Sequence, residues 1–123
     1  MNDPPRILVV EDQEDNRQIL RDLLTSVGYE VIQAENGEEG LATAARERPD
    51  LILMDIQLPL LDGYEVTRRI KADPALRAIP IIAITSYALS VDEGKARAAG
   101  CDAYVTKPYS TRALLAKIRE YVP

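Results

Sequence analysis

The sequence contains no histidine, no tryptophan and no phenylalanine, and its only cysteine is Cys101. Without histidine, the chain has no imidazole for acid–base catalysis or metal binding, and it cannot itself act as a phosphohistidine donor. A single cysteine excludes an internal disulfide framework and, with histidine absent, zinc sites of the Cys/His type. The chemistry of this protein must therefore come from carboxylates, lysine, hydroxyl groups and the backbone.

The sequence also lacks a basic excess and a long apolar segment. Its 20 acidic and 15 basic side chains give a net charge of −5, whereas a nucleic-acid-binding domain needs a basic footprint. No apolar run approaches the roughly 18 residues that a membrane span requires. No basic segment precedes a hydrophobic one at the N-terminus, as it would in a secretion signal. We therefore expect a cytoplasmic protein that binds neither nucleic acid nor a membrane.

What the sequence does contain is an ordinary globular composition and a regular alternation of two kinds of segment. Its 123 residues, 46% hydrophobic, fit one domain with one core, expected to span residues 1–123. Short apolar runs predict strands over residues 6–10, 30–34, 51–54, 79–84 and 103–105. Longer stretches with helical spacing lie between and after them, and this alternation predicts parallel strands joined by crossover helices.

Two of the predicted helices carry a clear apolar face, and the segment 30–34 is the most polar strand. The first helix has a stripe of Ile19, Leu20, Leu23, Leu24 and Val27, and the last has Leu114, Leu115, Ile118 and Tyr121. Weaker patterns predict helices over about 37–47 and 63–72. Because Glu30 and Gln33 interrupt their strand, we place it at an edge of the sheet.

Local signals mark where these helices begin and end. The segments NGEE (36–39), DGYE (62–65) and SVDE (90–93) each place a capping residue three positions before a glutamate. Gly28 and Gly100 stand where the first and fourth helices should end.

Reactive side chains follow the predicted strands at their carboxyl ends, where open parallel sheets bind ligands. Glu11 and Asp12 follow the first strand, Asp55 the third, Thr85 ends the fourth, and Lys107 follows the fifth. Since parallel strands end at the same edge, we expect these side chains to converge.

Carboxylates that converge in this way need a cation. A pair of like charges about 4 Å apart costs on the order of 4 kcal/mol at an effective dielectric constant near 20. Mg²⁺ prefers oxygen ligands and is usually held by one or two carboxylates together with phosphate oxygens. Mg²⁺ beside a free carboxylate, a lysine and a hydroxyl group makes a phosphoryl-transfer site. Asp55, in the middle of the group, is the expected nucleophile.

The motifs VVED, LILMDIQLP, AIT and VTKP, in this order, resemble those of the bacterial two-component receiver domain, of which CheY is the familiar single-domain example. The resemblance covers the chain from about Arg6 to Val122. The segments EDQEDN, DLILMDIQLP and GCDAYVTKP are similar to those of DivK-type single-domain response regulators. The resemblance to receiver domains implies an α/β fold of the doubly wound, flavodoxin-like (βα)5 type, with a five-stranded parallel sheet in the order 2-1-3-4-5.

The resemblance also assigns roles by position. It implies that Asp55 is the phosphoacceptor, that Asp12 and Asp55 bind Mg²⁺ directly, that Glu11 binds it through water, and that Gln57 binds it through its backbone carbonyl. Thr85 is similar to the switch hydroxyl, which turns toward the phosphoryl group.

Other implied features concern the fifth strand and its surroundings. Lys107 resembles the salt-bridge partner of the phosphoryl group, and the Lys107–Pro108 bond is expected to be cis. Tyr104 resembles the switch aromatic, although an aromatic residue in a strand is more often a packing residue. The glycine-containing fourth helix, at Gly94, is expected to shift on phosphorylation, and Tyr87, Leu89, Tyr104 and Tyr109 are expected on the surface that a partner reads.

The expected partners are a sensor histidine kinase or histidine phosphotransfer protein as donor, and a downstream protein effector. The resemblance implies that the donor docks mainly against the first helix, near Asn16, Arg17, Leu20 and the loop after the fifth strand. The chain is expected to catalyse its own Mg²⁺-dependent phosphorylation and dephosphorylation without turning over an external substrate.

Several alternatives remain open on the sequence alone. Asp12 could merely cap the first helix. The same topology could serve a flavodoxin-like nucleotide binder, although the acidic segment EDQEDN would repel phosphate. An aspartate-nucleophile phosphatase would need a second acid where Gln57 stands. The chain could also be the receiver domain of a larger hybrid kinase or regulator, against which its start at Met1 is mild evidence.

Overall fold

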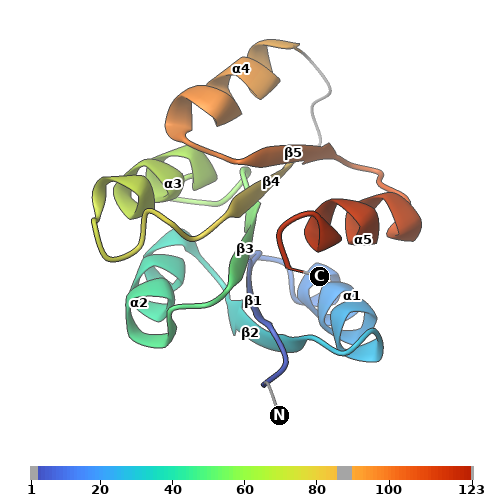
Figure 1. The fold of residues 1–123 in the computed structure, drawn as a ribbon. Coiled ribbons are helices and arrows are strands. Elements are labelled where there is room, and N and C mark those ends of the chain that lie inside the picture. Colours follow the sequence, from blue (N-terminus) through green and yellow to red (C-terminus); the bar gives the residue numbers. More distant parts are fainter. Residues whose placement is uncertain (1–2, 86–89, 123) are drawn as a thin grey trace.

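Five strands and five helices alternate along the chain in the computed structural model, which describes residues 3–85 and 90–122 (Figure 1). The strands are β1 (Arg6–Val10), β2 (Glu30–Ala34), β3 (Leu51–Asp55), β4 (Ile81–Thr85) and β5 (Ala103–Thr106). The helices are α1 (Glu14–Ser26), α2 (Gly37–Glu47), α3 (Gly63–Ala72), α4 (Ser90–Ala99) and α5 (Thr111–Arg119).

The strands form one parallel sheet in the order β2-β1-β3-β4-β5. This confirms the predicted doubly wound α/β fold and places β2 at an edge. The largest difference from the predicted strands is at β4, which begins at Ile81 and not at Ile79. Pro80 has no N–H to donate to a ladder, so regular pairing begins after it.

The helices cover both faces of the sheet and create two apolar clusters (Figure 1). Successive residues of a strand point to opposite faces, so Ile7 and Val9 belong to one cluster and Leu8 and Val10 to the other. The first cluster is completed by α1 and α5, and the second by α2, α3 and α4. The central strands are therefore apolar on both sides, as a sheet covered by helices requires.

The apolar stripe of α1 is narrower than the sequence pattern predicted. Leu20 and Leu24 are buried, but Ile19 is 60% exposed and Val27 is 38% exposed. Two members of the predicted stripe therefore lie outside the core. Only one side of α1 faces the sheet, and Ile19 lies off it.

Most of the predicted helix ends are confirmed. Asn36 and Asp62 accept hydrogen bonds from the backbone N–H groups of Glu39 and Glu65. Gly28 and Gly100 have φ of 96° and 106°, a left-handed conformation that favours glycine. The side chains of the SVDE segment lie outside the described part of the structure.

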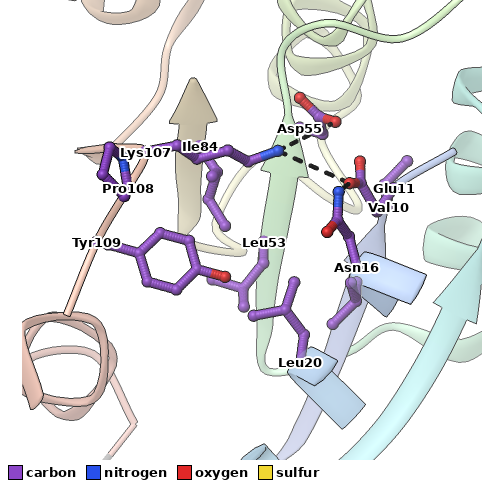
Figure 2. Close-up of a pocket in the computed structure, with 11 residues that line it drawn as sticks. Val10, Glu11, Asn16, Leu20, Leu53, Asp55, Ile84, Lys107, Pro108 and Tyr109 are labelled. Atoms are coloured by element: carbon purple, nitrogen blue, oxygen red, sulfur yellow. Dashed lines mark hydrogen bonds and ion pairs between the residues drawn. The ribbon is translucent and has the colours of Figure 1, made fainter. Parts of the chain in front are cut away.

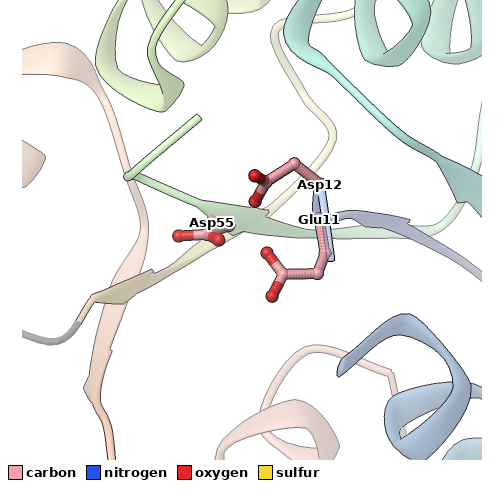
Figure 3. A group of neighbouring side chains, drawn as sticks. All are labelled: Glu11, Asp12 and Asp55. Atoms are coloured by element: carbon pink, nitrogen blue, oxygen red, sulfur yellow. The ribbon is translucent and has the colours of Figure 1, made fainter. Parts of the chain in front are cut away.

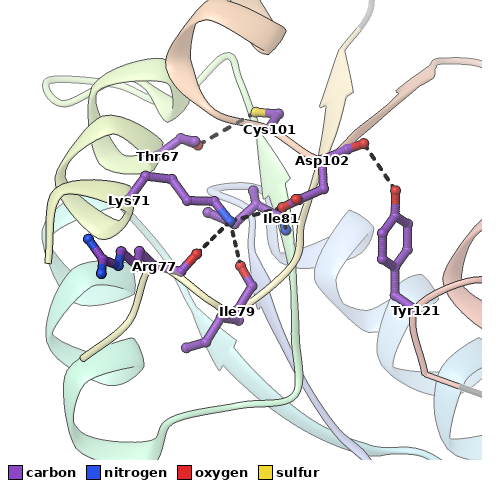
Figure 4. A network of polar contacts seen from close by, with 8 residues as sticks. All are labelled: Thr67, Lys71, Arg77, Ile79, Ile81, Cys101, Asp102 and Tyr121. Carbon is purple, nitrogen blue, oxygen red and sulfur yellow. Dashed lines mark hydrogen bonds and ion pairs between the residues drawn. The ribbon is translucent and has the colours of Figure 1, made fainter. Parts of the chain in front are cut away.

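A polar network ties three segments together at the amino end of the sheet (Figure 4). Lys71, at the end of α3, donates to the carbonyl oxygens of Arg77 and Ile79 and to Asp102 Oδ2, at 3.1, 2.8 and 2.9 Å. Asp102 also accepts from the N–H of Ile81, the first residue of β4. The network fixes the starts of β4 and β5 and lies at the end of the sheet opposite the carboxyl ends of the strands.

Within the described residues, no helix is both long enough and apolar enough to cross a lipid bilayer.

Candidate functional site

Glu11, Asp12 and Asp55 meet at the carboxyl edge of the sheet (Figure 3). Val10 pairs with Met54 across β1 and β3, so the residues that follow leave neighbouring strands at the same level. One carboxylate oxygen from each of the three acids lies within 4.8 Å of the others. Glu11 and Asp55 are 3% and 6% exposed, whereas Asp12 is open to solvent. The structure thus brings together the three acids that the sequence pattern singled out.

Lys107 reaches the same cluster from the end of β5 (Figure 2). Its Nζ lies 3.7 Å from Glu11 Oε1 and 3.8 Å from Asp55 Oδ2. The N–H of Lys107 donates to the carbonyl oxygen of Thr85 at 2.6 Å, and the Lys107–Pro108 bond is cis, as expected. The ammonium group of Lys107 thus lies close to two of the three carboxylates.

The backbone around Asp55 holds its carboxylate in place. The N–H of Gln57 donates to Asp55 Oδ1 at 2.9 Å, and Gly63 at the start of α3 packs against the backbone of Asp55 and Ile56. On β4, Ile84 is the register partner of Asp55, and the fully buried Thr85 follows it. Thr85 therefore lies beside the end of β3.

Glu11 carries the clearest electrostatic signature of the site. Asn16 donates to its Oε1 at 2.7 Å, but the buried Oε2 has no hydrogen-bond partner among the described residues. Burial, then the hydrogen bond and charge of Asp55, raise the pKa of Glu11 to about 7, although Asn16 and Lys107 act in the opposite direction. A buried acceptor without a donor costs free energy, and a hydrated cation would satisfy it.

Asp12 does not cap α1. The N-cap position is Gln13, and it makes no side-chain capping hydrogen bond. The alternative in which Asp12 serves only as a helix cap is therefore wrong, and its carboxylate lies with those of Glu11 and Asp55.

The predicted donor-docking residues of α1 are mostly inaccessible. Arg17 is 8% exposed and Leu20 is 4% exposed, so only Asn16 is partly accessible. The prediction that Arg17 and Leu20 lie at a docking surface is therefore wrong. A signal in the sequence could have shown this, because Arg17, Leu20 and Leu24 follow the three- and four-residue spacing of one helix face.

A cavity of about 500 Å³ opens next to the acid cluster, between α1 and the segment that follows β5 (Figure 2). Leu20, Leu53 and Ile84 line its apolar part, and Glu11, Asp55 and Lys107 line its polar end. The ring of Tyr109 also lines it, and burial together with the nearby charge of Glu11 raises the pKa of the Tyr109 hydroxyl.

Comparison with known proteins decides the family. The sequence profile of the response regulator receiver domain matches residues 7–119. The chain belongs to the receiver domain family. This receiver is 47% identical over 119 residues to the polar-differentiation response regulator DivK of Brucella anthropi. The alignment covers 97% of each chain. The receiver is 46% identical over 116 residues to DivK of Brucella abortus, in an alignment that covers 94% of each chain.

Solved structures of receivers have the same fold. The receiver domain of a sensor histidine kinase from Pseudomonas aeruginosa was solved with a magnesium ion coordinated in its active-site cleft. It is 38% identical to this receiver, with a TM-score of 0.89 over 96% of this chain and 97% of that one. The chemotaxis protein CheY4 of Vibrio cholerae has a TM-score of 0.91 at 27% identity, over 97% of this chain and 99% of that one. The predicted resemblance is confirmed, and this is a receiver domain of the kind found in two-component signalling.

The remaining predicted positions are only partly described. Tyr104 is half-buried and packs against the cluster formed with α2, α3 and α4, which agrees with a packing role. Tyr87 and Leu89, predicted on the output surface, lie outside the described residues.

Proposed function

We propose that this receiver takes a phosphoryl group from a phosphohistidine onto Asp55 in the presence of Mg²⁺. The observation that carries the proposal is the meeting of three carboxylates within 4.8 Å of one another beside the ammonium group of Lys107. In this proposal Asp55 is the phosphoacceptor, Thr85 and Lys107 respond to the phosphoryl group, and the chain signals by contact with proteins.

The donor set fits Mg²⁺. Hard carboxylate oxygens are the ligands that Mg²⁺ prefers, and this ion keeps several of its waters. Asp12 and Asp55 would bind it directly, Gln57 through its backbone carbonyl, and Glu11 through a water that donates to the unpartnered Oε2. When bound, the ion would neutralise charge on the oxygens of the transferring phosphoryl group. The magnesium ion in the receiver of the Pseudomonas aeruginosa kinase supports this assignment.

The side chains of this chain account for the transfer. The carboxylate of Asp55, oriented by the N–H of Gln57, attacks phosphorus. As the new O–P bond forms, the P–N bond of the phosphohistidine breaks and its electron pair returns to the imidazole. Lys107, close to Asp55 Oδ2, pairs with the anionic phosphoryl oxygens, and the hydroxyl of Thr85 donates to one of them. This is how the aspartate becomes a phosphoaspartate without a second protein catalyst.

The partners in this proposal are proteins. The donor is a sensor histidine kinase or a histidine phosphotransfer protein, and the output is a downstream effector that reads the conformational change. The response-regulator names of the relatives support this class of partner. We also propose that residues 1–123 act as one receiver unit in the cytoplasm, where phosphohistidine kinases present their donor group.

The test is phosphorylation of the parent and of two neutralised variants by acetyl phosphate with Mg²⁺, followed by intact-mass spectrometry. The parent should gain one phosphoryl group, and Asp55→Asn should gain none because its amide is a poor nucleophile. Asp62→Asn is the matched control. Asp62 caps α3 by accepting from Glu65 at 2.9 Å, and asparagine caps equally well, so this variant should be phosphorylated like the parent. Phosphorylation of Asp55→Asn would refute the assignment.

A further inference from the structure

Arg17 is a buried cation next to the acid cluster, and nothing in the proposed chemistry uses it. Its side chain is 9% exposed, and its Nη1 donates to the backbone carbonyl oxygen of Glu11 at 2.9 Å. Its Nη2 lies 3.4 Å from Oε1 of Glu35, whose side chain is 66% exposed. The stronger of the two contacts is therefore the one to the backbone of the site.

Packing does not explain an arginine at this position. Removing a guanidinium group from water costs several kcal/mol, and replacing buried ion pairs with apolar residues of similar volume is often neutral or stabilising. Its partner Glu35 is largely in solvent. The ion pair between them therefore offsets little of the free energy lost when the guanidinium group is removed from water. A leucine or methionine at this position could pack on the buried face of α1 that Arg17 shares with Leu20.

The carbonyl that Arg17 holds belongs to the peptide joining Glu11 to Asp12. The N–H of Glu11 donates to Ala34 on β2 at 3.1 Å, so this residue is fixed on one side by the sheet and on the other by Arg17. The Glu11–Asp12 peptide lies beyond β1 and before α1, outside both ladders. The contact with Arg17 therefore restrains a peptide that lies directly between the two carboxylate-bearing residues.

We propose that Arg17 is a positioning residue that fixes the Glu11–Asp12 peptide so that both carboxylates face Asp55. This rests on the proposed Mg²⁺ site, and it assigns to α1 a role in preparing that site before any ligand arrives. Residues that orient metal ligands typically change metal affinity by about 10–100-fold when they are replaced.

The sign of the effect separates positioning from simple electrostatics. A cation near the site repels Mg²⁺, so if charge alone mattered, removing Arg17 would tighten Mg²⁺ binding. If Arg17 were only a packing residue, its removal would change thermal stability and leave the affinity of the folded protein unchanged. Positioning alone predicts weaker binding by a folded variant.

The test is a Mg²⁺ titration of the parent, Arg17→Met, Arg17→Lys and Arg21→Met, followed by the amide resonances of residues 11–13 and by tyrosine fluorescence. Circular dichroism first establishes that each variant is folded at the temperature used. Arg21→Met is the control, because Arg21 lies one turn further along α1 and its side chain is 44% exposed. Its contact with Asp22 is long, at 3.5 Å. This substitution removes the same charge without touching the site.

Arg17→Met should raise the Kd for Mg²⁺ by about tenfold or more, Arg21→Met should leave it within about twofold, and Arg17→Lys, which keeps a donor, should recover part of the affinity. Equal or tighter binding by Arg17→Met would overturn the positioning role alone, provided the parent binds Mg²⁺ and Asp55 is phosphorylated. A parent that shows no saturable response to Mg²⁺ would overturn the metal site and, with it, the role of Arg17. Should Arg17→Met not fold, Arg17→Leu, which also lacks a donor, replaces it with the same expectations.

Discussion

Leu60 combines two unfavourable features at a single residue. Its φ is 66°, in the left-handed region, and its side chain is fully exposed. An L-residue in this conformation costs roughly 1–2 kcal/mol, and an exposed leucine regains nothing by burial. The residue lies in the loop between β3 and α3, shortly after Asp55, where loop geometry is tied to the site and not to local preference.

Leu60→Gly should therefore stabilise the protein. Glycine adopts positive φ without strain, but it loses more conformational entropy on folding, so we expect a net gain of up to about 1 kcal/mol in the free energy of unfolding. Urea denaturation measures it. The control is Leu61→Gly, because Leu61 is partly buried against the core and its loss should destabilise the protein. A Leu60→Gly variant that is no more stable than the parent would show that the strain is absorbed elsewhere.

At the scale of elements, the sequence predicted the order of strands and helices and most of their ends, because these depend on local signals. Asn36 and Asp62 cap their helices through their own side chains, and Gly28 supplies the positive φ that follows the end of α1. Such signals lie within a few residues of the structure they determine.

What the sequence did not predict depends on how elements pack. Ile19 was expected on the apolar face of the first helix and Arg17 at a docking surface, yet the structure has Ile19 exposed and Arg17 buried. Both errors follow from the rotation of α1 about its axis, which is set by its contacts with β1 and β2. The site acids were found because parallel topology alone brings strand ends together, whereas the rotation of a helix requires the packed structure.

The start of α3 is the element most closely joined to the site. A methyl group on Gly63 would approach the carbonyl oxygen of Asp55 more closely than van der Waals contact allows and would lie 2.8 Å from Ile56 Cα. Both neighbours are backbone atoms that a rotamer change cannot move. The backbone of Asp55 and the first turn of α3 are therefore held in one fixed relative position.

Gly63→Ala should destabilise the protein by about 1–3 kcal/mol, as overpacking typically does, and should slow phosphorylation of Asp55 in the fraction that remains folded. Gly94→Ala in α4 is the matched control, because a Cβ there meets no atom within 4 Å. That change should stabilise by about 0.5–1 kcal/mol, the usual difference between alanine and glycine inside a helix. Chemical denaturation and acetyl phosphate labelling measure the two effects. A fully active, fully stable Gly63→Ala protein would contradict the contact.

For the whole molecule, the acid cluster opposes folding when no cation is bound. The two apolar clusters favour the folded state at any pH, but closing them also drives Glu11 into a buried position beside Asp55. In the unfolded chain that carboxyl group has an ordinary pKa of 4.5, and in the folded protein the pKa is raised to about 7. The folded state therefore binds the Glu11 proton more tightly than the unfolded state does.

The sign of the pH dependence follows from this difference. The stabilising contribution of protonated Glu11 is fully present below about pH 4.5 and is lost as the pH rises through about 7. Glu11→Gln keeps a neutral side chain at every pH, so in a chelator-treated buffer its melting temperature should exceed that of the parent by a margin that grows between pH 5 and pH 8. Thermal melts of both proteins across this range measure the margin, and taking the difference cancels the titration of groups that do not interact with Glu11. A margin that stays constant from pH 5 to pH 8 would mean that Glu11 is already ionised in the folded protein at low pH, and that the metal-free cluster is less crowded than its geometry indicates.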